Sequence, residues 1–145
     1  MLWTTKEYKD FVIEFDARWK GTTPRGVDTG VEMRKPKIQL QLGVSGSLRV
    51  DMSGSFYTGG KPAYPEIGQA KDAKKLMKPE GEWNTFRIVQ KGDVTTVWLN
   101  GKLVVDHAKM ENFWDRTKPL PAKGPIMLQT HGGEIRWRNL FLKTL

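Results

Sequence analysis

The two histidines of the chain are its side chains best suited to proton transfer near neutral pH. Residues 129–131 end in His131, directly before Gly132 and Gly133. An imidazole titrates near neutral pH, so His131 is the first candidate for a general base or acid. The alternative is that His131 only hydrogen-bonds its own turn. His107, the other histidine, follows a β-rich run and is expected at the surface.

Strand alternation predicts which polar residues share a face of a sheet. Residues two apart in a strand point to the same side. Three polar pairs fit this spacing: Gln129 with His131, Glu32 with Arg34, and Gln39 with Gln41. Their apolar neighbours are expected to fill the space between two sheets: Val31, Met33, Ile38, Leu40, Ile126 and Leu128. The polar pairs would then line the opposite surface, which we interpret as a groove.

Each polar residue of this set suits a step in sugar chemistry. Arg34 is the candidate stabiliser of a developing oxyanion, because a fixed guanidinium offers several donors. Glu32 is the candidate for proton transfer or metal ligation, with Asp51 behind it. Glutamine amides suit sugar hydroxyls because each amide both donates and accepts; the candidates are Gln39, Gln41 and Gln129. A solvated strand face is the alternative for every one of them.

Aromatic side chains are the second class of candidate sugar contacts. Tyr57 lies in the irregular segment 53–79, where aromatic rings either border a cleft or pin the loop to the core. Trp114 lies in the irregular stretch 110–117 and is expected to expose its ring. Core packing is expected instead for the tryptophans inside strand patterns, which are Trp83, Trp98 and Trp137.

The elements that must position these residues are short alternating strands. Residues 11–17, 38–42 and 48–52 alternate apolar and polar side chains. Residues 86–105 predict a three-stranded meander whose second turn is Asn100-Gly101, because both residue types tolerate a positive φ. Residues 125–131 and 134–143 predict a strand pair joined by Gly132-Gly133. Helical periodicity is weak outside residues 69–77. Many short strands with glycine and proline turns indicate an all-β sandwich or jelly roll.

Length and composition narrow the function classes. A chain of 145 residues fits one domain, and the absence of cysteine excludes disulfides and thiolate chemistry. No run approaches the roughly 20 apolar residues of a membrane span, and the first 15 residues lack a basic region followed by an apolar stretch, so we expect no signal peptide within them. The net charge of +8 invites a nucleic-acid interpretation, but no recognition motif accompanies the scattered basic residues. We therefore expect neither nucleic acid nor membrane as partner.

Six stretches in the same order resemble the 3-keto-disaccharide hydrolase domain family, formerly a domain of unknown function. Together they extend over nearly the whole chain: LWT with YKDF near the start, DTGVEMR at 28–34, GEWNTF at 81–86, VWLNG at 97–101, GPIMLQTHG at 124–132 and IRWRNL at 135–140. The resemblance implies a concanavalin A-like lectin/glucanase jelly roll of two curved antiparallel sheets, with a ligand groove on the concave face. It also implies cleavage of bacterial 3-keto-glycosides and a periplasmic or secreted location.

The chain departs from the family pattern at three places. The family often has an acidic residue where Thr130 stands and a glutamate where Gln39 stands, so two carboxylates are missing. Family domains usually carry a further N-terminal segment, and we expect residues 1–145 to form one domain that begins late. Glu32 and His131 could share a divalent cation, although no tight ligand spacing supports one. The cofactor and the oligomeric state stay open.

Three functions are compatible with these residues. The first is a glycoside-cleaving hydrolase or lyase that removes the C2 proton beside a C3 ketone, eliminates the group on C1 and then adds water. The second is a non-catalytic carbohydrate-binding module of the same fold, which the missing carboxylates favour. The third, a structural or nucleic-acid-binding role, rests on the basic charge alone.

Overall fold

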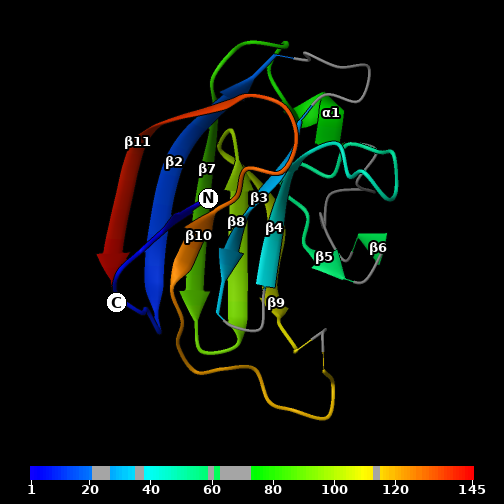
Figure 1. Cartoon of the computed structure of the whole chain (residues 1–145). Helices are drawn as coiled ribbons and strands as arrows, with labels where there is room; N and C mark the ends of the chain where they lie inside the picture. The colour runs from blue at the N-terminus through cyan, green and yellow to red at the C-terminus, as the bar shows by residue number, and fades with distance from the viewer. Residues whose placement is uncertain (21–26, 35–37, 59–60, 63–72, 113–114) are drawn as a thin grey trace.

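The computed structural model describes residues 1–20, 27–34, 38–58, 61–62, 73–112 and 115–145. Two antiparallel sheets form a jelly-roll sandwich (Figure 1). The four-stranded sheet has the order β1 (Leu2–Trp3), β10 (Ile126–Leu128), β3 (Asp28–Met33) and β4 (Ile38–Gly43). The five-stranded sheet has the order β11 (Ile135–Thr144), β2 (Phe11–Trp19), β7 (Asn84–Lys91), β8 (Val94–Leu99) and β9 (Lys102–Lys109). The remaining described elements are a small sheet of β5 (Tyr57–Thr58) and β6 (Lys61–Pro62), and the helix α1 (Ala73–Leu76).

The core lies between the two large sheets, as strand alternation predicts. In β2, Phe11, Ile13 and Phe15 are buried while the residues between them are partly exposed. Phe15 stacks on Phe86 of β7, with ring centroids 5.2 Å apart. The four-stranded sheet contributes the predicted apolar set to this core: Val31, Met33, Ile38, Leu40, Ile126 and Leu128. The prediction of an all-β jelly roll is confirmed.

The central meander of the five-stranded sheet follows the predicted turn chemistry. Strands β7, β8 and β9 pair in sequence order. Asn100 and Gly101 link β8 to β9 with φ of 50° and 76°, the left-handed backbone that a two-residue hairpin turn requires. The Asn100 side chain then accepts from the Thr85 backbone at 2.9 Å, and its amide donates to the Leu76 carbonyl at 3.0 Å.

Two predicted strand features are wrong. Residues 48–52 form turns instead of a strand: the Ser45 carbonyl accepts from the Arg49 amide at 2.7 Å, and Arg49 has a φ of 57°. Only an isolated bridge between Val44 and Asp51 remains. Strands β10 and β11 do not pair with each other, because Gly132 and Gly133 carry the chain from one sheet to the other.

The outer face of the five-stranded sheet carries cations and aromatic rings. Trp83 lies there and not in the core, with the Arg18 and Arg138 guanidinium carbons 5.0 and 4.0 Å from its ring centroid. Trp98 is likewise half-buried, with Arg87 at 5.6 Å. Trp137 packs against the core as predicted.

Asp16 on β2 anchors three strands of this outer face. Its carboxylate accepts from Thr85 Oγ1 at 2.8 Å, Asn139 Nδ2 at 2.9 Å and Arg138 Nε at 3.1 Å. Burial acts to raise the pKa of Asp16, but these hydrogen bonds outweigh it and hold the pKa below its ordinary value. Within the described residues, no helix has the length and apolar character needed to cross a membrane.

Candidate functional site

A polar pocket of about 300 Å³ opens on the outer face of the four-stranded sheet. Its lining residues come from the start of β3, from β4 and the turn after it, and from the segment after β10: Asp28, Gln39, Gln41, Ser45, Gly46, Ser47, Gln129 and His131. Four of the residues predicted to share a face therefore share one pocket: Gln39, Gln41, Gln129 and His131.

Strand register explains why the three glutamines converge. Gln39 and Gln41 alternate in β4 with Ile38 and Leu40, which are buried in the core, so the glutamines face outward. Gly30 of β3 pairs with Gln41, and the backbone amide of Gln129 donates to the Gly30 carbonyl at 2.9 Å. The glutamines of two separate segments thus flank one glycine.

A hydrogen-bond network holds these side chains in place. Gln39 Nε2 donates to Gln41 Oε1 and to Gln129 Oε1, both at 3.2 Å. Gln41 Nε2 donates to Asp28 Oδ1 at 2.7 Å, and the Gly46 amide donates to Asp28 Oδ2 at 2.9 Å. Both carboxylate oxygens of Asp28 are therefore engaged within the protein. The network orients the pocket walls before any ligand arrives.

His131 lies at the rim of the pocket and is exposed. The adjacent backbone is fixed, because the Asp28 amide donates to the Gly132 carbonyl at 3.2 Å. On the other side of His131, the Thr29 hydroxyl donates to the Gln129 carbonyl. The imidazole is thus carried by a backbone segment tied to β3 on both sides, while its ring remains accessible to a ligand.

Sequence reasoning missed Asp28 and the turn 45–47. Asp28 precedes Gly30 and Glu32 at two-residue spacing, so parity alone could have placed it on the outer face. Parity cannot be applied to residues 45–47, because they form a turn and not a strand. Only the path of the chain after β4 brings this turn to the pocket. There Ser45 Oγ lies 3.1 Å from Ser47 Oγ, and Gly46 approaches the Asp28 carboxylate.

The model of the family of 3-keto-alpha-glucoside-1,2-lyase-like domains matches residues 1–143 of the chain. The chain belongs to this family. No curated protein matches it in sequence. The family and its structural relatives support a carbohydrate-active function.

Solved structures from the bacterium Parabacteroides distasonis are similar to this family member. A "Putative glycosyl hydrolase" has 25% identity and a TM-score of 0.70, and the match covers 99% of this chain and 82% of that one. A second "putative glycosyl hydrolase" has 20% identity and a TM-score of 0.68, over 99% and 73% of the two chains. The cellulose-induced protein Cip1 shares the fold, at 13% identity and a TM-score of 0.54 over 94% and 68%.

Arg34 lies away from the pocket, contrary to the prediction that it shares a face with the other polar residues. Its φ is 50°, so strand alternation stops after Met33. The buried guanidinium donates to the Pro121 carbonyl at 3.1 Å and to the Lys9 carbonyl, and lies 3.6 Å from the Asp10 carboxylate. Burial lowers the pKa of Arg34, opposed by nearby carboxylates. These contacts describe a clamp between chain segments.

Two other predicted acids also lie outside the pocket lining. Glu32 is 3% exposed and stands opposite Gln39 in the register of β3 and β4, one row along the sheet from Gly30. Asp51 accepts a hydrogen bond from the Ser53 amide at 2.9 Å, which caps the turn after β4. Their predicted roles in proton transfer and substrate binding remain predictions, since neither side chain is part of the pocket lining.

The remaining predicted features are the two aromatic contacts, Tyr57 and Trp114, and a metal site. Tyr57 belongs to β5, but its side chain lies outside the described residues, and so does the whole of Trp114. The described residues contain no group of three or more His, Asp or Glu that could hold a metal ion. A divalent cation shared by Glu32 and His131 therefore remains an open alternative without a third His, Asp or Glu beside it in the described part of the chain.

Proposed function

We propose that the chain cleaves glycosides whose sugar ring carries a ketone at C3, and that it does so in the pocket of the four-stranded sheet. The observation that supports this most directly is the presence of an accessible imidazole, His131, beside three glutamine amides that are held in fixed orientation. The family membership supports the same class of substrate. Binding and proton transfer would then occur in one cavity.

A ketone at C3 makes the C2 proton acidic, which sets the order of the chemical steps. An imidazole nitrogen of His131 takes the C2 proton, and the electrons of the C–H bond move to the C3 carbonyl oxygen as an enolate. The enolate then re-forms the carbonyl, a C1=C2 double bond forms as the C1–O bond breaks, and the departing oxygen takes a proton from the His131 imidazolium or from water. Water adding across C1 and C2 completes hydrolysis. No pair of opposed carboxylates is needed.

The polar walls of the pocket would hold the sugar and stabilise the enolate. Gln129 uses its side-chain oxygen to accept from Gln39, so its amide nitrogen is the donor that it offers to a ligand. A donor fixed by the protein stabilises a developing oxyanion without reorganisation. Asp28 is a positioning residue in this proposal, since its carboxylate orients Gln41 and the turn at Gly46.

The alternative is a carbohydrate-binding module without catalysis. One observation favours it: Asp28 and His131 are the titratable residues of the pocket lining, and both oxygens of Asp28 are already hydrogen-bonded within the protein. An elimination needs a base and an acid for the leaving group. In the module, the glutamine amides would bind sugar hydroxyls and His131 would add a further polar contact.

The two histidines provide a matched test. We expect the purified chain to release the chromophore from a nitrophenyl 3-keto-glucoside but not from the unoxidised nitrophenyl glucoside, whose C2 proton is not acidic. His131→Ala should lower kcat/KM by about 10²–10⁴-fold, the usual contribution of a general base. His107→Ala changes an exposed histidine outside the pocket lining and should leave the rate unchanged. Assays with added Mg²⁺ or with EDTA would show whether turnover depends on a divalent cation.

Proton abstraction can be measured without cleavage. A 3-keto sugar that lacks a substituent on C1 cannot eliminate, but its C2 proton should exchange with D₂O when the protein is present, as read by NMR. Exchange that is lost in His131→Ala would support the enzyme. Saturable binding of the 3-keto sugar with neither exchange nor cleavage would refute the proposed reaction and leave the binding module.

A further inference from the structure

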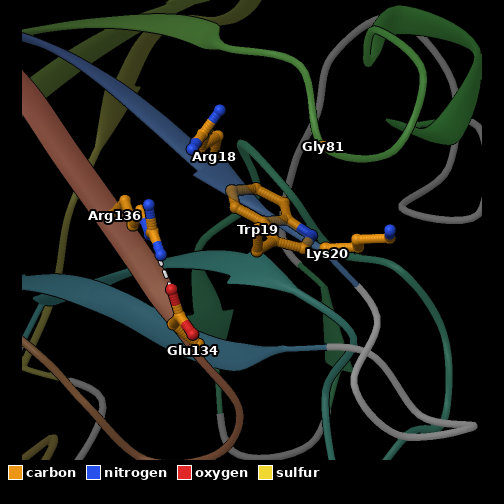
Figure 2. Close-up of a pocket in the computed structure, with 6 residues that line it drawn as sticks. All are labelled: Arg18, Trp19, Lys20, Gly81, Glu134 and Arg136. Atoms are coloured by element: carbon orange, nitrogen blue, oxygen red, sulfur yellow. Dashed lines mark hydrogen bonds and ion pairs between the residues drawn. The ribbon is translucent and has the colours of Figure 1, made fainter.

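A second pocket, of about 290 Å³, lies at the end of β2 where this strand meets β11 (Figure 2). It is lined by Arg18, Trp19, Lys20, Gly81, Glu134 and Arg136. None of these residues lines the polar pocket of the four-stranded sheet. Figure 2 shows the indole of Trp19 between the side chains of Arg18 and Lys20, with Arg136 on the neighbouring strand.

Positive charge is concentrated around this pocket. Arg18 and Arg136 stand directly opposite each other in the register of β2 and β11, an arrangement in which like charges destabilise a strand pair. The one carboxylate of the lining, Glu134, is already paired with Arg136 at 2.6 Å. Within the described part of the chain, no ion pair involves Arg18 or Lys20. An anionic ligand would relieve this repulsion.

The walls of the pocket are fixed in position. Trp19 packs against the core, pairs with Ile135 of β11, and accepts a hydrogen bond at its carbonyl from the Gly81 amide at 3.0 Å. The Arg18 guanidinium carbon lies 5.0 Å from the Trp83 ring centroid, a cation–π contact that limits its motion. The ligand would therefore meet an ordered indole and an ordered guanidinium.

We propose that this second pocket binds a sugar acid, meaning a pyranose ring that carries a carboxylate. A guanidinium matches a carboxylate with two parallel hydrogen bonds, and Arg18 and Arg136 both lie within one pocket. The indole of Trp19 offers a flat apolar face to the C–H face of the ring. A cavity of about 290 Å³ is at the small end of ligand pockets, so it would hold one acidic sugar unit of a longer ligand.

The net charge of +8 favours binding of the sugar acid but does not make that binding selective. A positive surface steers anions of any kind, so weak and salt-sensitive attraction of all polyanions is expected. Selectivity for a sugar acid must come from the pocket itself. The proposal is therefore tested by comparing ligands of equal size that differ only in charge, and variants of equal charge that differ only in position.

Isothermal titration of the chain with a galacturonate trisaccharide, with its methyl ester and with sodium sulfate makes the first comparison. We expect the acid to bind at least 10-fold more tightly than the uncharged ester and than sulfate. Equal affinity for acid and ester would overturn the assignment of charge recognition. Sulfate that binds as tightly as the trisaccharide would overturn the sugar part, because the pocket would then be an anion site only.

Two arginine variants and one control make the second comparison. Arg18→Gln and Arg136→Gln should each weaken binding of the acid at least 10-fold. Arg87→Gln removes the same charge from the same face of the sheet, where Arg87 is 49% exposed and paired with Glu14, and should have no effect beyond twofold. Circular dichroism establishes that each variant is folded. A loss in Arg87→Gln equal to that in Arg18→Gln would refute the site in favour of diffuse charge.

The polar pocket provides an independent check. His131→Ala should retain full affinity for the galacturonate trisaccharide, since His131 does not line the second pocket. If His131→Ala abolished that binding, the acid would be bound in the polar pocket and the proposal would fail. Cleavage of 3-keto-glycosides can fail without affecting this result, so the two proposals are tested separately.

Discussion

Replacing Arg34 with methionine distinguishes a structural clamp from a catalytic residue. Methionine keeps the length of the side chain and its apolar stem but removes every donor. The guanidinium of Arg34 is 3% exposed and donates to the carbonyls of Pro121 and Lys9. The variant therefore leaves two chain segments without the group that joins them to the end of β3.

The expected loss of stability follows from these two contacts. A hydrogen bond from a charged donor contributes about 1.5–3 kcal/mol, so two contribute about 3–6 kcal/mol. The lower value is expected, because Lys9 is exposed and water can replace the donor at its carbonyl. A loss of about 3 kcal/mol corresponds to a fall in Tm of about 6–12 °C for a chain of this size.

Urea unfolding gives the free energy, and the rate on the nitrophenyl 3-keto-glucoside gives the activity of the folded fraction. Arg49→Met is the matched control, because Arg49 has a similar φ of 57° but an exposed side chain, and its loss should stay within about 0.5 kcal/mol. Turnover per folded Arg34→Met molecule should remain within twofold. An Arg34→Met variant with unchanged stability and abolished turnover would refute the clamp and restore the predicted oxyanion role.

Two further predictions concern the sheets. Gly30→Ala would bring a Cβ within 2.6 Å of the Leu40 carbonyl oxygen and 3.1 Å of the Gln39 amide, so we expect a loss of about 1–3 kcal/mol in urea unfolding together with weaker sugar binding. Asp16→Asn should cost about 1–2 kcal/mol at pH 7. Because the folded pKa of Asp16 is lowered, its contribution is present above the unfolded pKa of about 3.9 and is lost as the pH falls through the folded value. Urea titrations at pH 7 and pH 3 should show the difference between Asp16→Asn and the parent chain shrinking; a constant difference would contradict it.

Periodicity predicted the strands whose two faces differ most. Strand β2 could be predicted because every second residue is buried in the core. The meander could be predicted because Asn100-Gly101 permits only a narrow set of turns. The prediction of a strand over residues 48–52 was wrong because apolar and polar residues also alternate in this turn. Within it, only Met52 is fully buried. Alternation reports burial, and it carries no information on whether a neighbouring strand is available for hydrogen bonding.

For the site, the sequence predicted which face of the sheet its residues occupy but not which residues meet there. Parity placed Gln39 and Gln41 outward, but which distant segment lies beside them depends on register, and the sequence does not encode register locally. Parity could have placed Asp28 on the same face, but only the register brings its carboxylate next to Gln41. The prediction for Arg34 was wrong because parity applies only while the backbone stays extended. At Arg34 the backbone has a positive φ of 50°, so the alternation of faces ends there.

The position of Gly30 explains why outward-facing residues of separate strands can act together. Neighbouring strands in a sheet stand about 4.8 Å apart, so side chains on adjacent strands normally compete for the space above the middle strand. Here the middle strand has no side chain at residue 30, and a Cβ would lie 3.1 Å from the Gln39 amide nitrogen. Gln39 can therefore lean across β3 and bond to Gln129 on the far side. The glycine thus lets polar side chains of separate segments meet on one face, and the selectivity for a ligand resides in those side chains and in His131 beside them.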